Sequence, residues 1–154
     1  MVANSMERNA VERDHAHWRD DHLAWAVEIQ AWERTIDAAL FDVELALWDS
    51  QYDKLDDRSP LNELERMYTA LNDLASSLRD HGDKIREHEA ALIQHRRQVA
   101  MVANMDASHV PESGHRIMTL VHDEQRAFRE RFRECFDATL CKLRSMLETR
   151  SGAI

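Results

Sequence analysis

The sequence predicts an all-α protein, an elongated antiparallel three-helix bundle whose helices run up, down and up. Apolar residues recur at alternating steps of three and four over three long segments, which places them on one face of a helix. The 154 residues include only 3 Gly and 2 Pro against 32% charged residues, a balance typical of long helices. Short breaks separate the segments, and short loops make sequential helices antiparallel neighbours.

The first segment predicts a helix over about residues 7–54. Its inward stripe steps by four and three in a heptad pattern, with one extra step of four between Ile36 and Leu40. That extra step predicts a stutter. The expected stripe is Val11, His15, Trp18, His22, Trp25, Ile29, Trp32, Ile36, Leu40, Val43 and Leu47.

The second segment predicts a helix over about residues 60–105. Ser59 suits an N-cap and Pro60 the first helical position. The heptad then continues unbroken, and because its phase persists across Gly82 we expect one continuous helix. One column is Leu64, Leu71, Leu78, Ile85, Leu92 and Val99, and the other is Met67, Leu74, His81, His88, His95 and Val102.

The third segment predicts a helix over about residues 111–150, entered through the loop "DASHVPESGH". Cys135 is expected to be a small core residue, and its separation from Cys141 on one helix argues against a disulfide. The arginines of "RAFRERFRE" are expected on a salt-bridged solvent face. The expected stripe is Met118, Val121, Gln125, Phe128, Phe132, Cys135, Thr139, Leu143 and Met146.

The composition and motifs of the chain limit its expected binding partners and reactions. The formal net charge is -9 with basic residues interspersed among acids, which disfavours nucleic acid as a partner. No apolar run is long enough to span a membrane and the start lacks a secretory signal, so we expect a cytoplasmic protein. No nucleophile–base pair, phosphate loop or dinucleotide fingerprint is present, so the sequence names no reaction and leans against an enzyme.

The chain is expected to form one domain over residues 1–154. Three thin apolar stripes leave the flanking residues Phe41, Leu45 and Trp48 to cover. We therefore expect a homo-oligomer, in the simplest case a dimer, and a protein partner would fit the same surface.

All nine histidines fall in three short stretches of the chain. None lies between Trp25 and Asp80, and none lies after Asp123. Folding the chain back near Ser59 and near Val110 brings these stretches together, so every histidine is expected in one half of the bundle. Leu, Ile, Met and Phe line the other half. The positions are 15, 17, 22, 81, 88, 95, 109, 115 and 122.

This gathering predicts a transition-metal site, because neutral imidazole is the commonest side-chain ligand for zinc, copper, nickel and iron. The best-stocked region combines His15, His22, His95 and His122, with Asp14 and Asp21 at the edge of the stripe. The candidate ligands are His15, His22, His81, His88, His95, His115, His122 and Glu112.

The levels of these ligands follow from matching antiparallel helices. We expect His22 to face the Leu92–His95 level and His15 the Val99–Val102 level. Glu112 and His115, three apart, add a second cluster with His109 at the loop.

Other uses of the same residues compete with metal binding. The histidines and tryptophans could instead form a ladder that fixes the helix register of a structural or adaptor bundle. This interpretation and metal binding have nearly equal weight. Protonation below about pH 6 would place repelling charges inside the bundle, which describes a pH switch. A di-iron site needs a second Glu-x-x-His motif that is missing, and a haem between His22 and His95 has no attachment motif.

Overall fold

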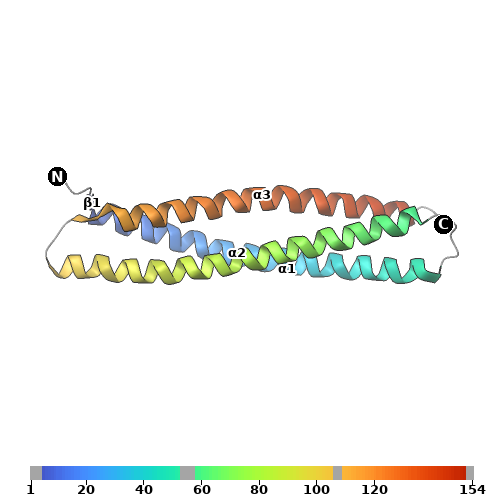
Figure 1. Ribbon diagram of the computed structural model, residues 1–154, viewed down its shortest axis with the longest axis horizontal. Coiled ribbons are helices and arrows are strands. Elements are labelled where there is room, and N and C mark those ends of the chain that lie inside the picture. The colour runs from blue at the N-terminus through green and yellow to red at the C-terminus, as the bar shows by residue number, and fades with distance from the viewer. Residues whose placement is uncertain (1–4, 53–57, 106–108, 152–154) are drawn as a thin grey trace. The chain divides into compact units, whose positions relative to one another are not determined.

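The computed structural model describes residues 5–52, 58–105 and 109–151 (Figure 1). Three helices dominate it: α1 (Arg8–Tyr52), α2 (Ser59–Asn104) and α3 (Glu112–Ser151). Two short strands, β1 (Ser5–Glu7) and β2 (His109–Pro111), complete the fold. The all-α class is confirmed, and each helix begins and ends within two residues of the expected position. Over the described part of the chain, no helix has a stretch apolar enough to cross a bilayer.

The core stripe of α1 keeps its heptad without a stutter. After Ile36 the buried positions are Ala39, Val43 and Ala46, whereas Leu40 and Leu47 are only half-buried. The expected extra step is therefore wrong. Hydrophobicity alone selects leucine over alanine, but a small side chain at a close helix–helix contact keeps the three-four spacing.

The heptad of α2 is confirmed over its whole length. Every position of the two columns from Leu64 to Val99 is buried, and the helix continues through Gly82. Its second half buries histidine wherever its first half buries leucine or methionine in the same column.

The stripe of α3 differs from the expected one by a single residue at three positions, each one heptad after the last. Its buried residues are His122, Arg129 and Phe136 in place of Val121, Phe128 and Cys135, and Cys135 is exposed. The polar residues are buried because they have partners: His122 contacts Asp21, and the Arg129 guanidinium lies 4.9 Å from the centre of the Trp32 ring. The prediction that Arg129 faces solvent is therefore wrong.

The chain divides into two compact units. The histidine unit comprises Met1–Glu28 and His81–Phe128, and the apolar unit comprises Ile29–Asp80 and Arg129–Ile154. All nine histidines of the chain belong to the histidine unit, as the sequence predicted.

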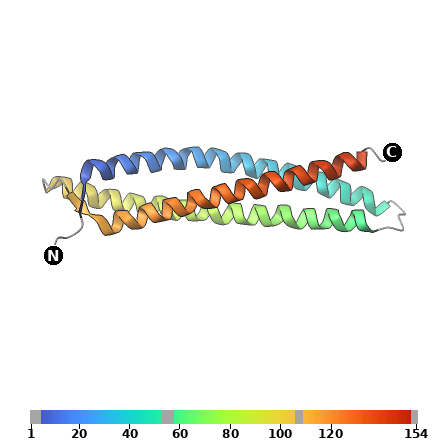
Figure 2. The same ribbon diagram turned by 90° about the horizontal axis from the view of Figure 1, so that it is seen from above.

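In the histidine unit the start of α1, the end of α2 and the start of α3 lie side by side, in blue, yellow and orange (Figures 1 and 2). Ring contacts join His15 to His95 and to His115, and join His22 to His88 and to His122. Between these two sets of contacts the residue number rises on α1 and α3 and falls on α2. Within this unit α2 therefore runs antiparallel to its two neighbours.

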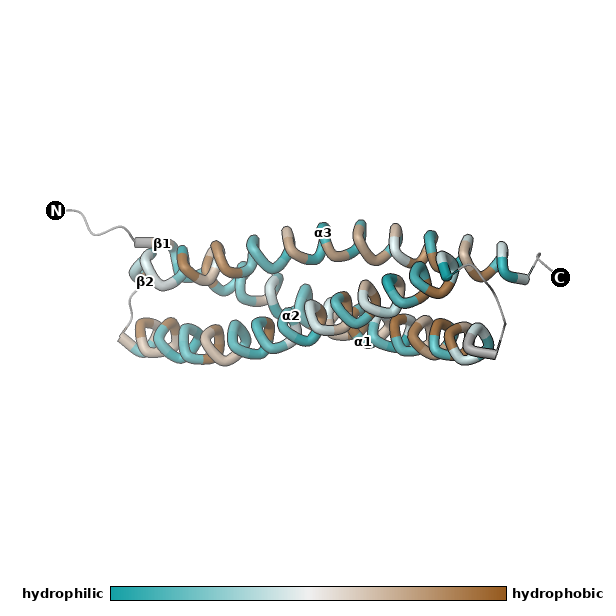
Figure 3. Tube along the Cα trace, turned by 45° about the vertical axis from the view of Figure 1, so that its right-hand side comes forward, coloured by the Kyte–Doolittle hydropathy of each residue, from teal (hydrophilic) through white to brown (hydrophobic). Residues whose placement is uncertain are grey.

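The apolar unit has an ordinary hydrophobic core. Ile36, Leu71 and Leu78 are almost fully buried, and Trp32 packs against Phe132 with ring centres 4.9 Å apart. Hydrophobic residues recur along each helix between hydrophilic ones, in brown and teal in Figure 3. This spacing is that of an amphipathic helix with one buried face.

A small antiparallel ladder lies at the end of the histidine unit. Met6 of β1 is paired with Val110 of β2, and Val110 packs on Val11 and Val99. Val11 and Val99 lie one helical turn beyond His15 and His95, and together with Val110 they form the layer next to the histidines. The strands were not predicted, because three residues are too few to show strand periodicity.

We expect Phe136→Ala to lower the free energy of unfolding by about 3–5 kcal/mol, because it empties a packed core position. Cys135→Ala, at the neighbouring exposed position, is expected to change it by less than about 0.5 kcal/mol. Denaturant unfolding followed by circular dichroism measures both. Equal losses in the two variants would contradict the observed phase of α3.

Candidate metal centre

Six buried histidines form two groups with the same construction. The first triad is His15, His95 and His115, and the second triad is His22, His88 and His122. Each triad takes one histidine from each helix, and its ligand nitrogens all lie within 4.8 Å of one another. A step of seven residues on every helix separates the two triads, which is about 10 Å along a helix axis.

Two histidines of the first triad are joined by a hydrogen bond, and a second hydrogen bond leads from them to a carboxylate. His95 Nε2 lies 3.3 Å from His115 Nδ1, and His115 Nε2 lies 2.8 Å from Asp14 Oδ2. Trp18 stacks on the His115 ring with centres 5.0 Å apart. The carboxylate and the indole together fix the orientation of this imidazole.

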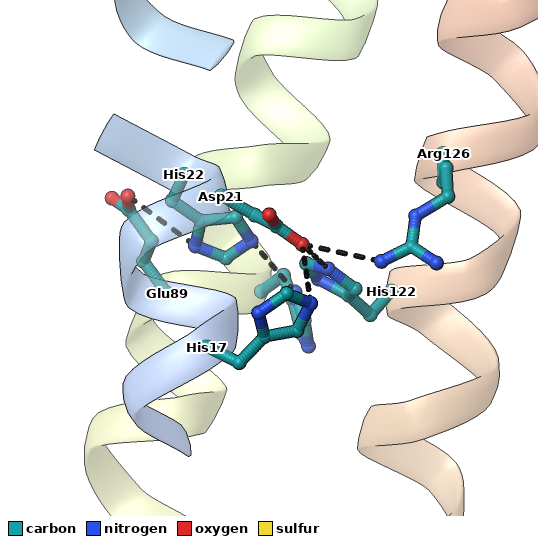
Figure 4. Close-up of polar contacts among 7 residues, drawn as sticks. His17, Asp21, His22, Glu89, His122 and Arg126 are labelled. Atoms are coloured by element: carbon teal, nitrogen blue, oxygen red, sulfur yellow. Dashed lines mark hydrogen bonds and ion pairs between the residues drawn. The ribbon is translucent and has the colours of Figure 1, made fainter. Parts of the chain in front are cut away.

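The second triad keeps the contact between an aspartate of α1 and the histidine of α3, but its hydrogen bond between histidines joins α1 to α2, and it has additional charged neighbours (Figure 4). His22 Nε2 lies 3.3 Å from His88 Nδ1, and His122 Nε2 lies 2.7 Å from Asp21 Oδ2. Asp21 also contacts Arg126 at 3.2 Å and His17 at 3.6 Å. Glu89 Oε1 lies 3.5 Å from His22 Nδ1, on the side of the ring away from His88.

A seven-residue repeat in α1 generates both sites. The chain reads Asp14-His15 with Trp18, and then Asp21-His22 with Trp25. In each copy the histidine enters a triad, while the aspartate contacts, and the tryptophan stacks on, the histidine that α3 contributes. Trp25 lies 4.8 Å from His122 between ring centres, with 16° between the planes. The alternation of His and Trp along this stripe therefore builds two copies of one site.

The aspartates select which nitrogen faces the triad. When His115 Nε2–H donates to Asp14, Nδ1 of the neutral ring keeps its lone pair, and the same holds for His122 and Asp21. His115 Nδ1 lies next to His95 Nε2, while His122 Nδ1 has no hydrogen-bond partner within the described chain. The His122 lone pair is therefore open to a ligand inside the bundle, whereas the His115 lone pair accepts the N–H of His95 Nε2 and becomes available only when a metal ion replaces that proton.

Three ring nitrogens are buried without a partner. They are His15 Nε2 in the first triad, and His88 Nε2 and His122 Nδ1 in the second. A buried polar atom without a hydrogen bond destabilises the fold by about 1–3 kcal/mol. A ligand that completes each triad would satisfy His15 Nε2 and His122 Nδ1. His88 faces the second triad through its other nitrogen, Nδ1.

The surroundings keep these rings uncharged. Burial lowers the pKa of His15 to about 4, with His95, His115 and Arg96 acting in the same direction and Asp14 opposing them. Burial likewise lowers the pKa of His88 to about 4, with His22 and His122 adding to it. It also lowers the pKa values of His22, His95 and His122. Neutral imidazole is the form that binds metal ions.

Asp21 is held in the opposite, charged state. Burial raises the pKa of its carboxyl group, but the His122 hydrogen bond, His17 and Arg126 outweigh that effect and lower it overall. The carboxylate therefore stays available to accept the His122 N–H near neutral pH.

Several expected assignments are corrected by this arrangement. His22 meets His88 and His15 meets His95, so the expected levels are wrong by about one heptad. His22 and His95 belong to different triads, which removes the facing pair considered for haem. His115 lies in the first triad and does not cluster with Glu112 and His109.

The structure places the remaining candidates outside both triads. His81 is buried and stacks on Phe128 with ring centres 4.5 Å apart. Glu112 is the half-buried first residue of α3, and His109 is exposed on β2. None of them belongs to a metal-competent group of the described residues.

Sequence reasoning missed one side chain beside the second triad, Glu89, and expected the other, Gln125, in the inward stripe of the third helix. Glu89 faces His22, and Gln125 is buried with its Nε2 donating to the Lys84 carbonyl. The sequence placed Gln125 in the region of the histidines, and its side chain interacts with His22 and His88 there. Glu89 directly follows the inward His88 in the chain, so its position at the edge of the stripe was the available signal.

Acid is expected to destabilise the metal-free protein. Because the pKa values of His15 and His88 are about 4 in the folded state against about 6.5 when unfolded, the unfolded chain binds more protons between these values. The free energy of unfolding is therefore expected to be constant above about pH 6.5 and to fall as the pH drops toward 4. Each of the two histidines contributes up to about 1.4 kcal/mol per pH unit to this fall. Thermal unfolding in chelator at stepped pH measures this, and His109→Gln serves as an exposed control. A flat profile from pH 7 to 4 would contradict the neutral, buried state of the rings.

Comparisons with protein-family models, curated proteins and solved structures find no match to this chain. Its function is therefore argued from the site itself. The geometry shows a small helical protein with two buried histidine groups that could each hold a metal ion.

Proposed function

We propose that this protein binds divalent transition-metal ions, one at each triad. The observation that carries the proposal is the repetition: two layers, one heptad apart, each gather three buried histidines from three helices. One buried histidine is commonly a satisfied core residue. Two triads of the same construction, with unpartnered ring nitrogens in both, are better explained by a ligand.

The ring geometry fits tetrahedral coordination. Zinc–nitrogen bonds of about 2.0–2.1 Å in a tetrahedron put neighbouring ligand atoms about 3.3–3.4 Å apart. His95 Nε2 and His115 Nδ1 are 3.3 Å apart, as are His22 Nε2 and His88 Nδ1. The third histidine of each triad is within 4.8 Å and would draw in by ring rotation. Three protein ligands leave a fourth position for water or another ligand.

The outer contacts fit the same role. Metal-binding histidines usually donate their other N–H to a carboxylate or carbonyl, which fixes the tautomer and raises ligand basicity. Asp14 and Asp21 stand in this relation to His115 and His122, and Glu89 lies beside the outer nitrogen of His22. A site made of neutral imidazoles suits zinc, nickel, copper and iron.

We expect chelator-treated protein to take up two equivalents of zinc in a calorimetric titration. His15→Leu removes a ligand of the first triad, and His88→Leu removes one of the second, so each variant is expected to bind one equivalent. The double variant should bind none. His81→Leu replaces a buried histidine outside the triads and should still bind two. Two equivalents in the double variant, or none in the wild type, would refute the proposal.

The variant His15→Leu also distinguishes a metal site from a structural His–Trp ladder. Without metal, His15→Leu is expected to raise the free energy of unfolding by about 1–3 kcal/mol, because it removes a buried unpartnered nitrogen without breaking the hydrogen bond that joins His95 to His115. With zinc, the wild type should melt at a higher temperature and the variant should gain less. A less stable metal-free variant, with no effect of zinc on the wild type, would favour the structural reading.

A further inference from the structure

We infer that the two sites differ in the ligands they accept, and that the first triad opens onto a hollow that binds a small anion beside its metal ion. This inference rests on the proposed function. It assigns the ligand class of one site, and it predicts that the other site lacks that ligand.

The hollow adjoins the first triad directly, because His15 belongs to both. Its volume is about 390 Å³, which is enough for a small anion with water. Its walls come from the first turns of α1 and the last turns of α2. The lining residues are Glu12, His15, Ala16, Arg19, Arg96, Val99 and Ala100.

Positive charge dominates this hollow. Arg19 and Arg96 line it from two different helices, and the only acid in its lining, Glu12, forms an ion pair with Arg8 at 3.7 Å. A divalent ion at the triad would add to this field, so the natural occupant is an anion.

The chemistry of arginine points to the class of anion. A guanidinium offers several N–H donors in a plane and pairs well with carboxylate-like oxygens. Three histidines leave one metal position open, so a small anion in the hollow could contact the metal and an arginine together. Carboxylates and other small anions of similar size fit this description.

The second triad provides an internal comparison, because every lining position has an equivalent one heptad away. Arg19 corresponds to Ala26, and Arg96 corresponds to Glu89. The small residues Ala16 and Ala100 correspond to the larger Leu23 and Ile93. The equivalents of the lining residues are Arg19, His22, Leu23, Ala26, Glu89, Leu92 and Ile93.

The second triad therefore has a negative charge at the position equivalent to Arg96. Where the first has the Arg96 cation, the second has Glu89, whose carboxylate lies 3.5 Å from His22 Nδ1. That carboxylate repels an incoming anion and supports the bound cation. The repeat that copies the ligands puts Ala26 and Glu89 in the places of Arg19 and Arg96. Arg19 itself takes the place of Glu12 in the second set, so one arginine beside a carboxylate replaces the two arginines of the first.

Cobalt(II) with azide as the probe anion tests this. His88→Leu leaves the first triad intact, and His15→Leu leaves the second. Cobalt uptake is measured first in each variant, and azide is then added while the visible bands of cobalt are followed. We expect azide to shift the bands of His88→Leu, and to leave those of His15→Leu unchanged over the same range of concentration.

Arginine variants connect the response to the hollow. In the His88→Leu background, Arg19→Gln with Arg96→Gln is expected to raise the half-saturating azide concentration at least about tenfold, the factor of one charge-assisted hydrogen bond. Arg126→Gln, which alters an arginine beside the second triad, is the matched control and should leave it unchanged.

The outcomes separate the two proposals. Absence of cobalt from both variants would overturn the metal-binding function and this inference with it. Cobalt binding with no azide response, with equal responses at both triads, or with no effect of the arginine variants would overturn the inference alone. A response confined to the first triad and weakened by the arginine variants supports it.

Discussion

The candidate site depends on a shared heptad register among three helical segments. Moving up α1 by seven residues replaces His15 by His22, and the same distance along the other two helices replaces each remaining ligand of the first triad by one of the second. If one segment were shifted by a single residue, its side chain would turn by about 100° and leave the layer. The triads therefore require that all three segments keep phase, and the unbroken heptads of α1 and α2 and the corrected stripe of α3 provide this.

The same register places residues that do not favour burial inside the bundle. Imidazole nitrogens without partners oppose folding, and burial keeps the rings neutral only because charging them there is unfavourable. The Leu- and Phe-rich core of the apolar unit and the valines beside the strands have no such conflict. Buried histidines that oppose folding occur here twice, at equivalent positions. This pattern fits a binding site, since function is the usual reason for locally unfavourable residues.

Much of this could be predicted from sequence, for physical reasons. Long apolar periodicity gives helices and their ends, and the reversals of the chain at its two short breaks bring the nine histidines together. The exact level of His22 against His88 could not be predicted, because antiparallel stripes of similar residues match nearly as well after a shift of one heptad. Arg129 was misplaced because its burial depends on the Trp32 ring, a partner 97 positions away in the sequence. The division of the histidines into two triads could not be predicted either. Each triad takes one histidine from each of three helices, so the spacing within a single helix does not define a site.

The central claim is that both metal ions lie inside the bundle, each held by three ring nitrogens. Anomalous diffraction at the zinc edge from crystals of the zinc-loaded protein tests it most directly. The account predicts two peaks about 10 Å apart, one among His15, His95 and His115 and the other among His22, His88 and His122. Zinc found only on surface carboxylates, or a single peak bridging the two layers, would contradict it.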